Sequence, residues 1–394
     1  MPSSDLPRRR SPAAWVIAPL LLIVLTLSLA EIALRVGFYL FPPANYNLLP
    51  PDIANLHFFE PSTGNAFYAI KPNFQQKFLR DEFRIDVRTN NIGLREDTDY
   101  RGEAVDIGFI GDSYTFGWGV ETGERYSDFV RNAFPGLKVL SYSYPDGHAP
   151  INYLSFLQAR PELMPRVLVL GLFAFNDLAS DTADAVVTER DGIVQSVGSR
   201  SLKVDEEGYI VARDFTPPRF PSSDWFARHT AVGRAVNVAY HRLRSGGRMP
   251  PKPDKFRPID RGQWDETALQ GLKDIQRIDE LARQAGATLV VFYIPFPSYV
   301  GAASVCIYAP PLCARQRKEN VLGEALGSWA VANGIRLIDP TETFRALTGR
   351  GQALYYREDG HWTVEGHAAA GRLIADYIER EGLLNPAPPA EPQH

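Results

Sequence analysis

Cysteine is scarce in this chain, which has two cysteines and three methionines among its 394 residues. So few cysteines exclude a disulfide-dense scaffold and a zinc site of four thiolates. An excess of positive charge is also lacking, since 42 Lys and Arg stand against 46 Asp and Glu and the net charge is −4. We therefore expect no nucleic-acid partner. Glycine and proline, 31 of each, are at ordinary levels, which leaves a globular protein of one large domain or two smaller ones.

The amino-terminal region contains a long uncharged run. Residues Ala13 to Ala30, 30 − 13 + 1 = 18 positions, carry no charge and follow Arg8-Arg9-Arg10. As a helix this run is roughly 27 Å long, close to the hydrocarbon thickness of a bilayer. The arginines favour a cytoplasmic amino terminus, so we expect a membrane anchor over 13–38 and a periplasmic or extracytoplasmic catalytic part. The alternative is a signal peptide cleaved after Ala30, because Ser28-Leu29-Ala30 is an acceptable site.

The compartment decides how the two cysteines are interpreted. Cys306 and Cys313 lie close together in the stretch CIYAPPLC. Thiols oxidise outside the cytoplasm. We therefore predict a small disulfide between them rather than two reactive thiols.

Five short apolar runs are unbroken, as is typical of strands buried on both faces of a parallel sheet. They are 105–110, 137–140, 167–173, 288–294 and 335–338. Helical patterns separate them, most clearly at Asp265–Ala285 and Val364–Ile378. This alternation predicts an α/β fold, a three-layer α/β/α sandwich around a parallel sheet.

An insertion interrupts the alternation from about 178 to 258. Hairpin-like segments come first, followed by a helix from about Asp224 to Arg244, of which one face carries Trp225, Val232, Val236, Ala239 and Leu243. We expect a cap subdomain whose amphipathic helix packs on the domain. The alternative is a helix that rests on lipid headgroups near the anchor.

A candidate nucleophile follows the first predicted strand directly, in Gly111-Asp112-Ser113. The carboxyl ends of parallel strands are where α/β sheets build their sites, and a serine there becomes a nucleophile if a base reaches it. Of the seven histidines, His361 follows the last strand, with Asp359 two residues before it to orient the imidazole. His367, inside the next helix, is expected to be structural.

Donors for an oxyanion are expected at two further strand ends. The backbone N–H of Gly147 follows the second strand, and the side-chain amide of Asn176 follows the third. Together with the N–H of Ser113 they would form an oxyanion hole.

These four blocks resemble those of the SGNH (GDSL-type) hydrolase family. Gly111-Asp112-Ser113 matches the nucleophile block, Gly147 the glycine block, Asn176 the asparagine block, and Asp359 with His361 the acid–base block. The resemblance implies a flavodoxin-like sheet, ester chemistry through an acyl-serine, and no metal or other cofactor. Ser143 or Tyr144 stands where the glycine block often has asparagine, so Gly147 is the weakest match.

The acid of the last block has two candidates. Family members commonly place it three residues before the histidine, where this chain has Glu358, whereas Asp359 is two before. We favour Asp359, because Asp-x-His-Trp also resembles alginate-type polysaccharide O-acetyltransferases. In those proteins the pair precedes the serine, whereas here it follows, and this order supports the SGNH assignment.

These expectations divide the chain into five parts: a cytoplasmic basic tail (1–12), the anchor (13–38), a stalk or amino-terminal extension (39–104), the SGNH domain (105–381, insertion about 178–258) and a disordered tail (382–394). In the extension, Arg88 to Arg95 reads RTNNIGLR. We favour turn chemistry with flanking salt bridges there. The alternative is that the arginines hold an anionic substrate.

The function predicted is that of a serine esterase or O-acyltransferase acting on acyl esters, foremost the O-acetyl groups of polysaccharide or cell-envelope glycan. One alternative is a lipid esterase. Another is a non-catalytic, membrane-tethered glycan-binding or assembly protein on a degenerate scaffold. A metal-dependent phosphoesterase using Asp112, Asp359 and His361 is disfavoured, because divalent sites usually need more ligands.

Overall fold

The computed structural model describes residues 12–43, 48–49, 51–61, 67–244, 259–260, 263–302 and 320–385. The chain divides into two compact units. The smaller consists of 1–55, 79–81 and 216–250, and the larger of 56–78, 82–215 and 251–394. Cys306 and Cys313 lie outside the described residues, so their disulfide stays a prediction.

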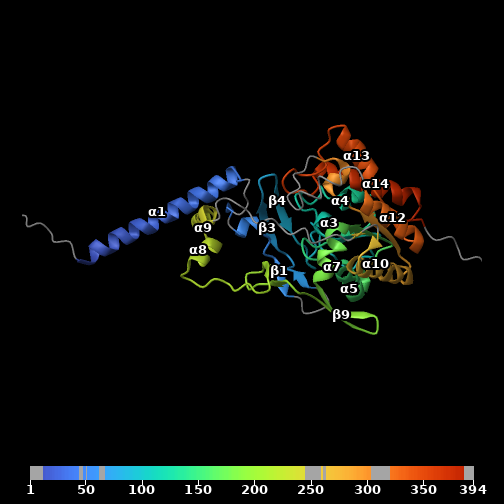
Figure 1. The fold of residues 1–394 in the computed structure, drawn as a ribbon, viewed down its shortest axis with the longest axis horizontal. Coiled ribbons are helices and arrows are strands. Elements are labelled where there is room, and N and C mark those ends of the chain that lie inside the picture. Colours follow the sequence, from blue (N-terminus) through green and yellow to red (C-terminus); the bar gives the residue numbers. More distant parts are fainter. Residues whose placement is uncertain are drawn as a thin grey trace, which may run out of the picture. The chain divides into compact units, whose positions relative to one another are not determined.

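A five-stranded sheet forms the centre of the larger unit (Figure 1). Its strands are β5 (Ile107–Gly111), β6 (Val139–Ser141), β7 (Val167–Leu172), β14 (Thr288–Tyr293) and β15 (Arg336–Ile338). All neighbours pair in parallel, and the order is β15-β14-β7-β5-β6. Numbered along the chain this order is 2-1-3-4-5, the flavodoxin-like arrangement. All five strands overlap the five apolar runs of the sequence.

Alternate side chains of each strand enter two separate cores. Leu168 and Leu170 of β7 pack with α5 (Pro150–Ala159), α10 (Glu266–Gln284) and α12 (Val321–Asn333). Val167 and Val169 face α4 (Tyr126–Ala133), α13 (Thr341–Gly349) and α14 (Val364–Arg380). Burial on both faces confirms the predicted three-layer sandwich.

Small elements complete the larger unit. Short helices are α3 (Ser113–Phe116), α6 (Ala174–Asp177) and α7 (Ser180–Asp184), with 3-10 turns η2 (Pro161–Leu163) and η3 (Pro297–Val300). Antiparallel pairs are β1 (Phe59–Pro61) with β2 (Tyr68–Ile70), β3 (Gln75–Leu79) with β4 (Arg84–Arg88), β8 (Ala185–Arg190) with β9 (Ile193–Ser199), β10 (Leu202–Val204) with β11 (Ile210–Ala212), and β12 (Ile259–Asp260) with β13 (Gln263–Trp264).

Most of the extension expected as a stalk is part of the larger unit's core. Phe58, Tyr68 and Phe78 are at most 1% exposed and belong to the same hydrophobic cluster as β7. Such apolar side chains would be solvated in a stalk, so burying them stabilises the fold. Residues from Leu56 onward therefore belong to the domain, whereas those up to Asn55 fall in the smaller unit.

The smaller unit is built on α1 (Pro12–Leu40), a 29-residue helix. Its segment Trp15–Leu40 is long and apolar enough to cross a membrane, with a mean hydropathy of 2.4. Leu49, Ala54 and Leu79 form a small core with Phe38 of α1 and Ile53 of α2 (Pro51–Ala54).

The insertion does not form one cap subdomain. Its part up to Phe215 belongs to the larger unit, where Val194 and Val197 of β9 are buried in the core. Its part from Thr216 belongs to the smaller unit. The helix expected over 224–244 is also two helices, α8 (Ser223–His229) and α9 (Ala231–Arg244), because Thr230 has an extended backbone (φ −131°, ψ 145°).

Candidate active site

The nucleophile block lies at the carboxyl end of β5, the strand that lies between β7 and β6 in the sheet. Only glycine fits at Gly111, since a Cβ there would lie 2.2 Å from Thr115 Oγ1 and 2.7 Å from the Gly171 carbonyl oxygen of β7. Asp112 caps α3 by accepting the Tyr114 N–H at 3.0 Å. Ser113 thereby becomes the first residue of α3, with its hydroxyl at the edge of the sheet.

Ser113, His361 and Asp359 form a continuous hydrogen-bonded relay. The Ser113 Oγ lies 2.8 Å from His361 Nε2, and His361 Nδ1 lies 2.5 Å from Asp359 Oδ1. Because a carboxylate only accepts, Nδ1 carries the proton and Nε2 is free to accept from the serine. This is the arrangement of nucleophile, general base and orienting acid.

Of the two candidate acids, the geometry favours Asp359. The Glu358 carboxylate pairs with the Arg357 guanidinium at 3.8 Å, and its side chain is 46% exposed. The Asp359 side chain is 14% exposed, and its second oxygen accepts from Trp118 Nε1 at 3.3 Å. A spacing of two residues suffices because Gly360 between acid and base has a φ of +84°, a conformation that glycine adopts without strain.

The loop that carries Asp359 is held by Glu82, a residue that the sequence did not reveal. The Glu82 carboxylate accepts three successive backbone N–H groups, those of Arg357 (2.7 Å), Glu358 (2.7 Å) and Asp359 (2.8 Å). Glu82 precedes β4 in the extension, far from the loop in sequence. No local signal marks it, because in the sequence Glu82 looks like any exposed glutamate beside a strand, and only the fold brings the loop to it.

Aromatic side chains brace the same loop. The Tyr114 hydroxyl donates to the Gly360 carbonyl at 3.0 Å, and the Tyr356 hydroxyl donates to the Gly119 carbonyl at 2.8 Å. The rings of Tyr114 and His361 lie 4.7 Å apart. These contacts tie the acid–base block to the segment that follows the nucleophile.

The expected oxyanion donors lie at the ends of the strands on either side of β5. Gly147 follows β6 and has a φ of +67°, and Asn176 is in α6, after β7. The Asn176 amide nitrogen donates to Asp181 Oδ2 at 2.7 Å. An amide has two N–H groups, so this bond orients the group and leaves a second donor.

Buried carboxyl groups surround the serine. Asp112 is 3% exposed, and burial raises its pKa to about 6, an effect that the nearby His361 opposes. Asp177 is fully buried, and burial raises its pKa well above the usual range, as do the charges of Asp112 and Asp181. Burial therefore makes ionisation of both carboxyls less favourable than in water.

Two other histidines near the sheet are structural. Burial lowers the pKa of His367 to about 3, and its Nδ1 accepts the backbone N–H of Tyr126 at 3.3 Å. Burial lowers the pKa of His148 to about 4, and its ring stacks on Tyr144 with centroids 4.0 Å apart. Each is neutral and packed, which agrees with the structural role expected for His367.

The segment from Arg88 to Arg95 forms a turn. The Asn90 side chain accepts from the N–H groups of Ile92 (3.1 Å) and Leu94 (3.0 Å), as in an Asx turn. Arg95 is 1% exposed and donates to the carbonyls of Phe116 (2.8 Å), Gly117 (2.7 Å) and Val120 (2.6 Å), so it supports the segment that carries Trp118. The structure therefore favours the turn over the binding of an anion.

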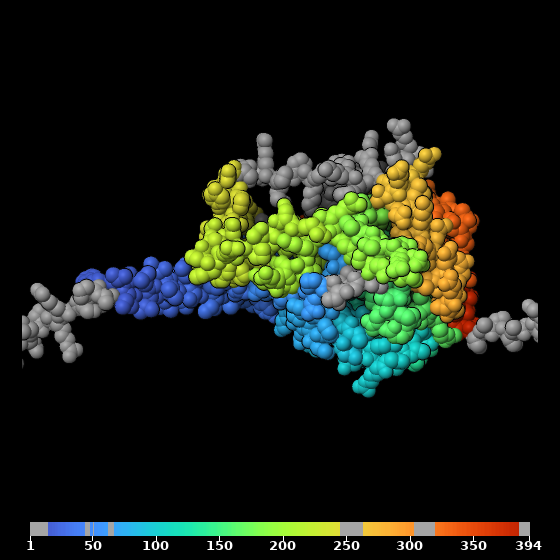
Figure 2. Space-filling model, turned by 90° about the horizontal axis from the view of Figure 1, so that it is seen from below, coloured from blue at the N-terminus to red at the C-terminus, as the bar shows by residue number. Residues whose placement is uncertain are grey.

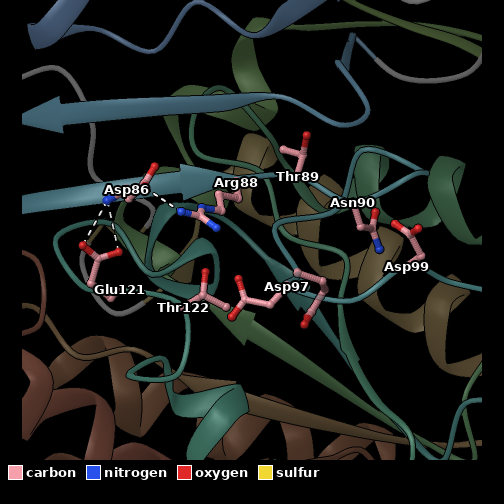
Figure 3. Close-up of a pocket in the computed structure, with 9 residues that line it drawn as sticks. Asp86, Arg88, Thr89, Asn90, Asp97, Asp99, Glu121 and Thr122 are labelled. Carbon is pink, nitrogen blue, oxygen red and sulfur yellow. Dashed lines mark hydrogen bonds and ion pairs between the residues drawn. The ribbon is translucent and has the colours of Figure 1, made fainter.

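A polar pocket of about 450 Å³ lies along this segment (Figure 3). Its charged lining is acidic apart from Arg88, which donates to Asp86 at 3.2 Å. The carboxylates are those of Asp86, Glu96, Asp97, Asp99 and Glu121. Such a lining repels anions, and neither Ser113 nor His361 contributes to it. In the described part of the chain no three His, Cys, Asp or Glu side chains are grouped to hold a metal ion.

Residues 260–393 match the model of the SGNH hydrolase-like domain of the acetyltransferase AlgX. This match contains Asp359 and His361 but not Ser113. No curated protein matches the chain.

Solved structures of three hydrolases are similar to this chain at low identity. A member of the lipolytic G-D-S-L family from Veillonella parvula is 13% identical, covering 70% of this chain and 100% of that one, with a TM-score of 0.36. The esterase EstA from Pseudoalteromonas sp. is 11% identical, covering 70% and 97%, with a TM-score of 0.36. A GDSL-like lipase from Bacteroides thetaiotaomicron is 13% identical, covering 70% and 88%, with a TM-score of 0.32. The match over residues 260–393 confirms the resemblance to the SGNH hydrolases that the four strand-end blocks predicted.

Proposed function

We propose that this chain is an extracytoplasmic serine-dependent ester hydrolase or acyl transferase, tethered to the membrane by α1. One observation carries the proposal: the Ser113 hydroxyl lies 2.8 Å from His361 Nε2, and Asp359 holds the opposite nitrogen at 2.5 Å. A scaffold that only bound glycan would have no need of this relay.

The relay performs acyl transfer in two halves. Ser113 Oγ attacks the ester carbonyl carbon while its proton passes to His361 Nε2, and Asp359 stabilises the resulting imidazolium. The oxyanion accepts from the Ser113 and Gly147 N–H groups and from the free N–H of the Asn176 amide. Each such donor is worth about 10²–10³ in kcat. When the carbonyl re-forms, the leaving alkoxide takes the proton from His361 and an acyl-serine remains.

Water or a sugar hydroxyl completes the second half by the same route in reverse. His361 takes its proton, the new oxygen bonds to the acyl carbon, and Ser113 leaves as a hydroxyl. We propose O-acetyl groups of polysaccharide or cell-envelope glycan as the substrate, because the matched model describes an acetyltransferase domain. Lipid esters are the alternative substrate.

The test compares wild type, Ser113→Ala and His361→Ala on p-nitrophenyl esters of increasing chain length. Ser201→Ala and His241→Ala, at exposed positions outside the relay, are matched controls. We expect both site variants to lose turnover and both controls to keep it. Product formed only when glycan is present would identify a transferase, and preference for long chains would favour the lipid esterase. Wild-type rates in folded Ser113→Ala would refute the proposal.

A further inference from the structure

The hairpin of α8 and α9 packs against α1 within the smaller unit (Figures 1 and 2). The Glu31 carboxylate of α1 accepts the first two N–H groups of α9, those of Ala231 (2.9 Å) and Val232 (3.0 Å). Arg35 donates to Glu31 at 2.6 Å and to Asp52 at 2.7 Å. An anion is favourable at a helix amino terminus, so this cluster pins α9 to one level of α1.

That level is where the uncharged run of α1 ends. Glu31 is the first charged residue after Ala13–Ala30, a run of roughly hydrocarbon thickness. Trp15, near the start of the run, is 71% exposed, and aromatic residues are typical of a membrane interface. If α1 spans a bilayer, α9 therefore begins at the headgroup level.

The apolar face of α9 is exposed. Val236, Tyr240 and Leu243 are 64%, 54% and 84% exposed. Their spacing of four and three residues places them on one helix face. An amphipathic helix normally buries that face, yet Ala231 is the buried residue of α9. Phe220, which precedes α8, and Phe226, within α8, are also exposed, at 67% and 44%.

The charges of the hairpin complement an anionic surface. The segment 222–244 contains four arginines and one acidic residue, Asp224. Arg242 and Arg244 lie on the two flanks of the apolar face, from which long side chains reach headgroups while the apolar residues enter the acyl boundary.

We propose that α8 and α9 form an interfacial hairpin that lies on the anionic headgroups of the bilayer crossed by α1. The partner that covers the exposed face is thus an anionic lipid surface of phosphatidylglycerol type. The inference rests on the anchor in the proposed function and is independent of the ester chemistry.

The experiment uses the full chain in nanodiscs, with Cys306 and Cys313 changed to serine. An environment-sensitive fluorophore is attached at Val236→Cys or Leu243→Cys, and at His241→Cys as the matched control. His241 lies about 200° around the helix from Leu243. Quenching by nitroxide-labelled lipid is measured in phosphatidylcholine alone and in its mixture with phosphatidylglycerol.

We expect blue-shifted emission and several-fold stronger quenching at Val236 and Leu243 than at His241, and a further increase with phosphatidylglycerol. Arg242→Gln and Arg244→Gln should each weaken the phosphatidylglycerol effect about fivefold, the contribution of one basic residue near an anionic surface. Equal quenching at the three positions would overturn the proposal. A blue shift without lipid quenching would also overturn it, because it would mean that protein covers the face. Quenching that does not change with phosphatidylglycerol would overturn it too.

Two measurements on the same samples separate this inference from the proposed function. Intact mass shows whether residues 1–30 are retained, which tests the anchor. Turnover of p-nitrophenyl acetate tests the ester chemistry, and we expect the probe positions to leave it unchanged.

Discussion

Glu82→Gln tests how the acid of the relay is positioned. The carboxylate accepts three N–H groups at 2.7–2.8 Å from the loop that carries Asp359. Glutamine retains one acceptor and turns an NH₂ donor toward at least one N–H donor. Hydrogen bonds to a charged group are worth about 1.5–3 kcal/mol each. Losing one such bond and the charge assistance of the others should cost the ordered loop about 2–4 kcal/mol.

We expect this cost to lower kcat about 30- to 900-fold. The loss is smaller than that from removing the acid, because Trp118, Tyr114 and Tyr356 still hold the loop. KM for a small ester should stay within about twofold, since Glu82 acts through the loop rather than on substrate. The assay is steady-state hydrolysis of p-nitrophenyl acetate, with the melting temperature measured alongside.

The matched control is Glu121→Gln. Glu121 also accepts a backbone N–H, that of Asp86 at 3.0 Å, but it does not hold the Asp359 loop. A second test combines Glu82→Gln with Asp359→Asn, in which Glu82→Gln should have little further effect. Equal kcat values for Glu82→Gln and Glu121→Gln, or full additivity in the double variant, would refute the reasoning.

Three further predictions follow from the same contacts. Asp359→Asn should lower kcat by about 10⁴, whereas Glu358→Gln should stay near wild type in the same assay, and the reverse result would reassign the acid. Asp128→Asn should cost about 1.5–3 kcal/mol in urea denaturation, because it removes the 2.7 Å partner of buried Arg125 and leaves Glu96, at 3.3 Å, as its remaining carboxylate; Asp106→Asn, at the surface pair with Arg166, is the control. Burial opposes ionisation of Asp128, but Arg125 outweighs it and holds the pKa below the usual range, so the contribution is present above about pH 4 and lost below it. Asp112→Asn keeps the cap on Tyr114 and removes a carboxyl whose pKa burial raises to about 6. The free energy of unfolding of the wild type should therefore fall as pH rises from about 4 through 6. Relative to the wild type, the variant should be more stable by up to about 3 kcal/mol at pH 7 and equally stable at pH 4. An equal gain at both pH values would contradict this.

Local patterns were enough to predict the sheet and the blocks at its strand ends. Each of the five apolar runs forms a strand of the sheet. A strand that is covered on both faces has apolar side chains at successive positions, so a few neighbouring residues are enough to show the pattern. The placement of Ser113, Gly147, Asn176 and His361 after those strands followed from the same pattern, because parallel strands deliver their carboxyl ends to one edge.

Local sequence patterns did not predict how the insertion packs. The amphipathic face of 224–244 was visible in the sequence, but amphipathicity does not say which surface a helix packs on. Glu31 decided that by capping α9, about 200 positions further along the chain. The break at Thr230 is likewise a backbone conformation that no residue type there demands.

The sequence by itself determined the order of strands and helices, the apolar amino-terminal segment, and the residue types of a serine relay, because periodicity and turn chemistry act over a few residues. Only the tertiary structure placed the Asp359 carboxylate rather than that of Glu358 against His361, gave Arg95 a buried supporting place, and brought Glu82 to the loop 275 residues away. These outcomes depend on which distant backbone groups become buried together. A buried N–H or carbonyl must find a partner wherever the fold supplies one, and no local pattern encodes that partner.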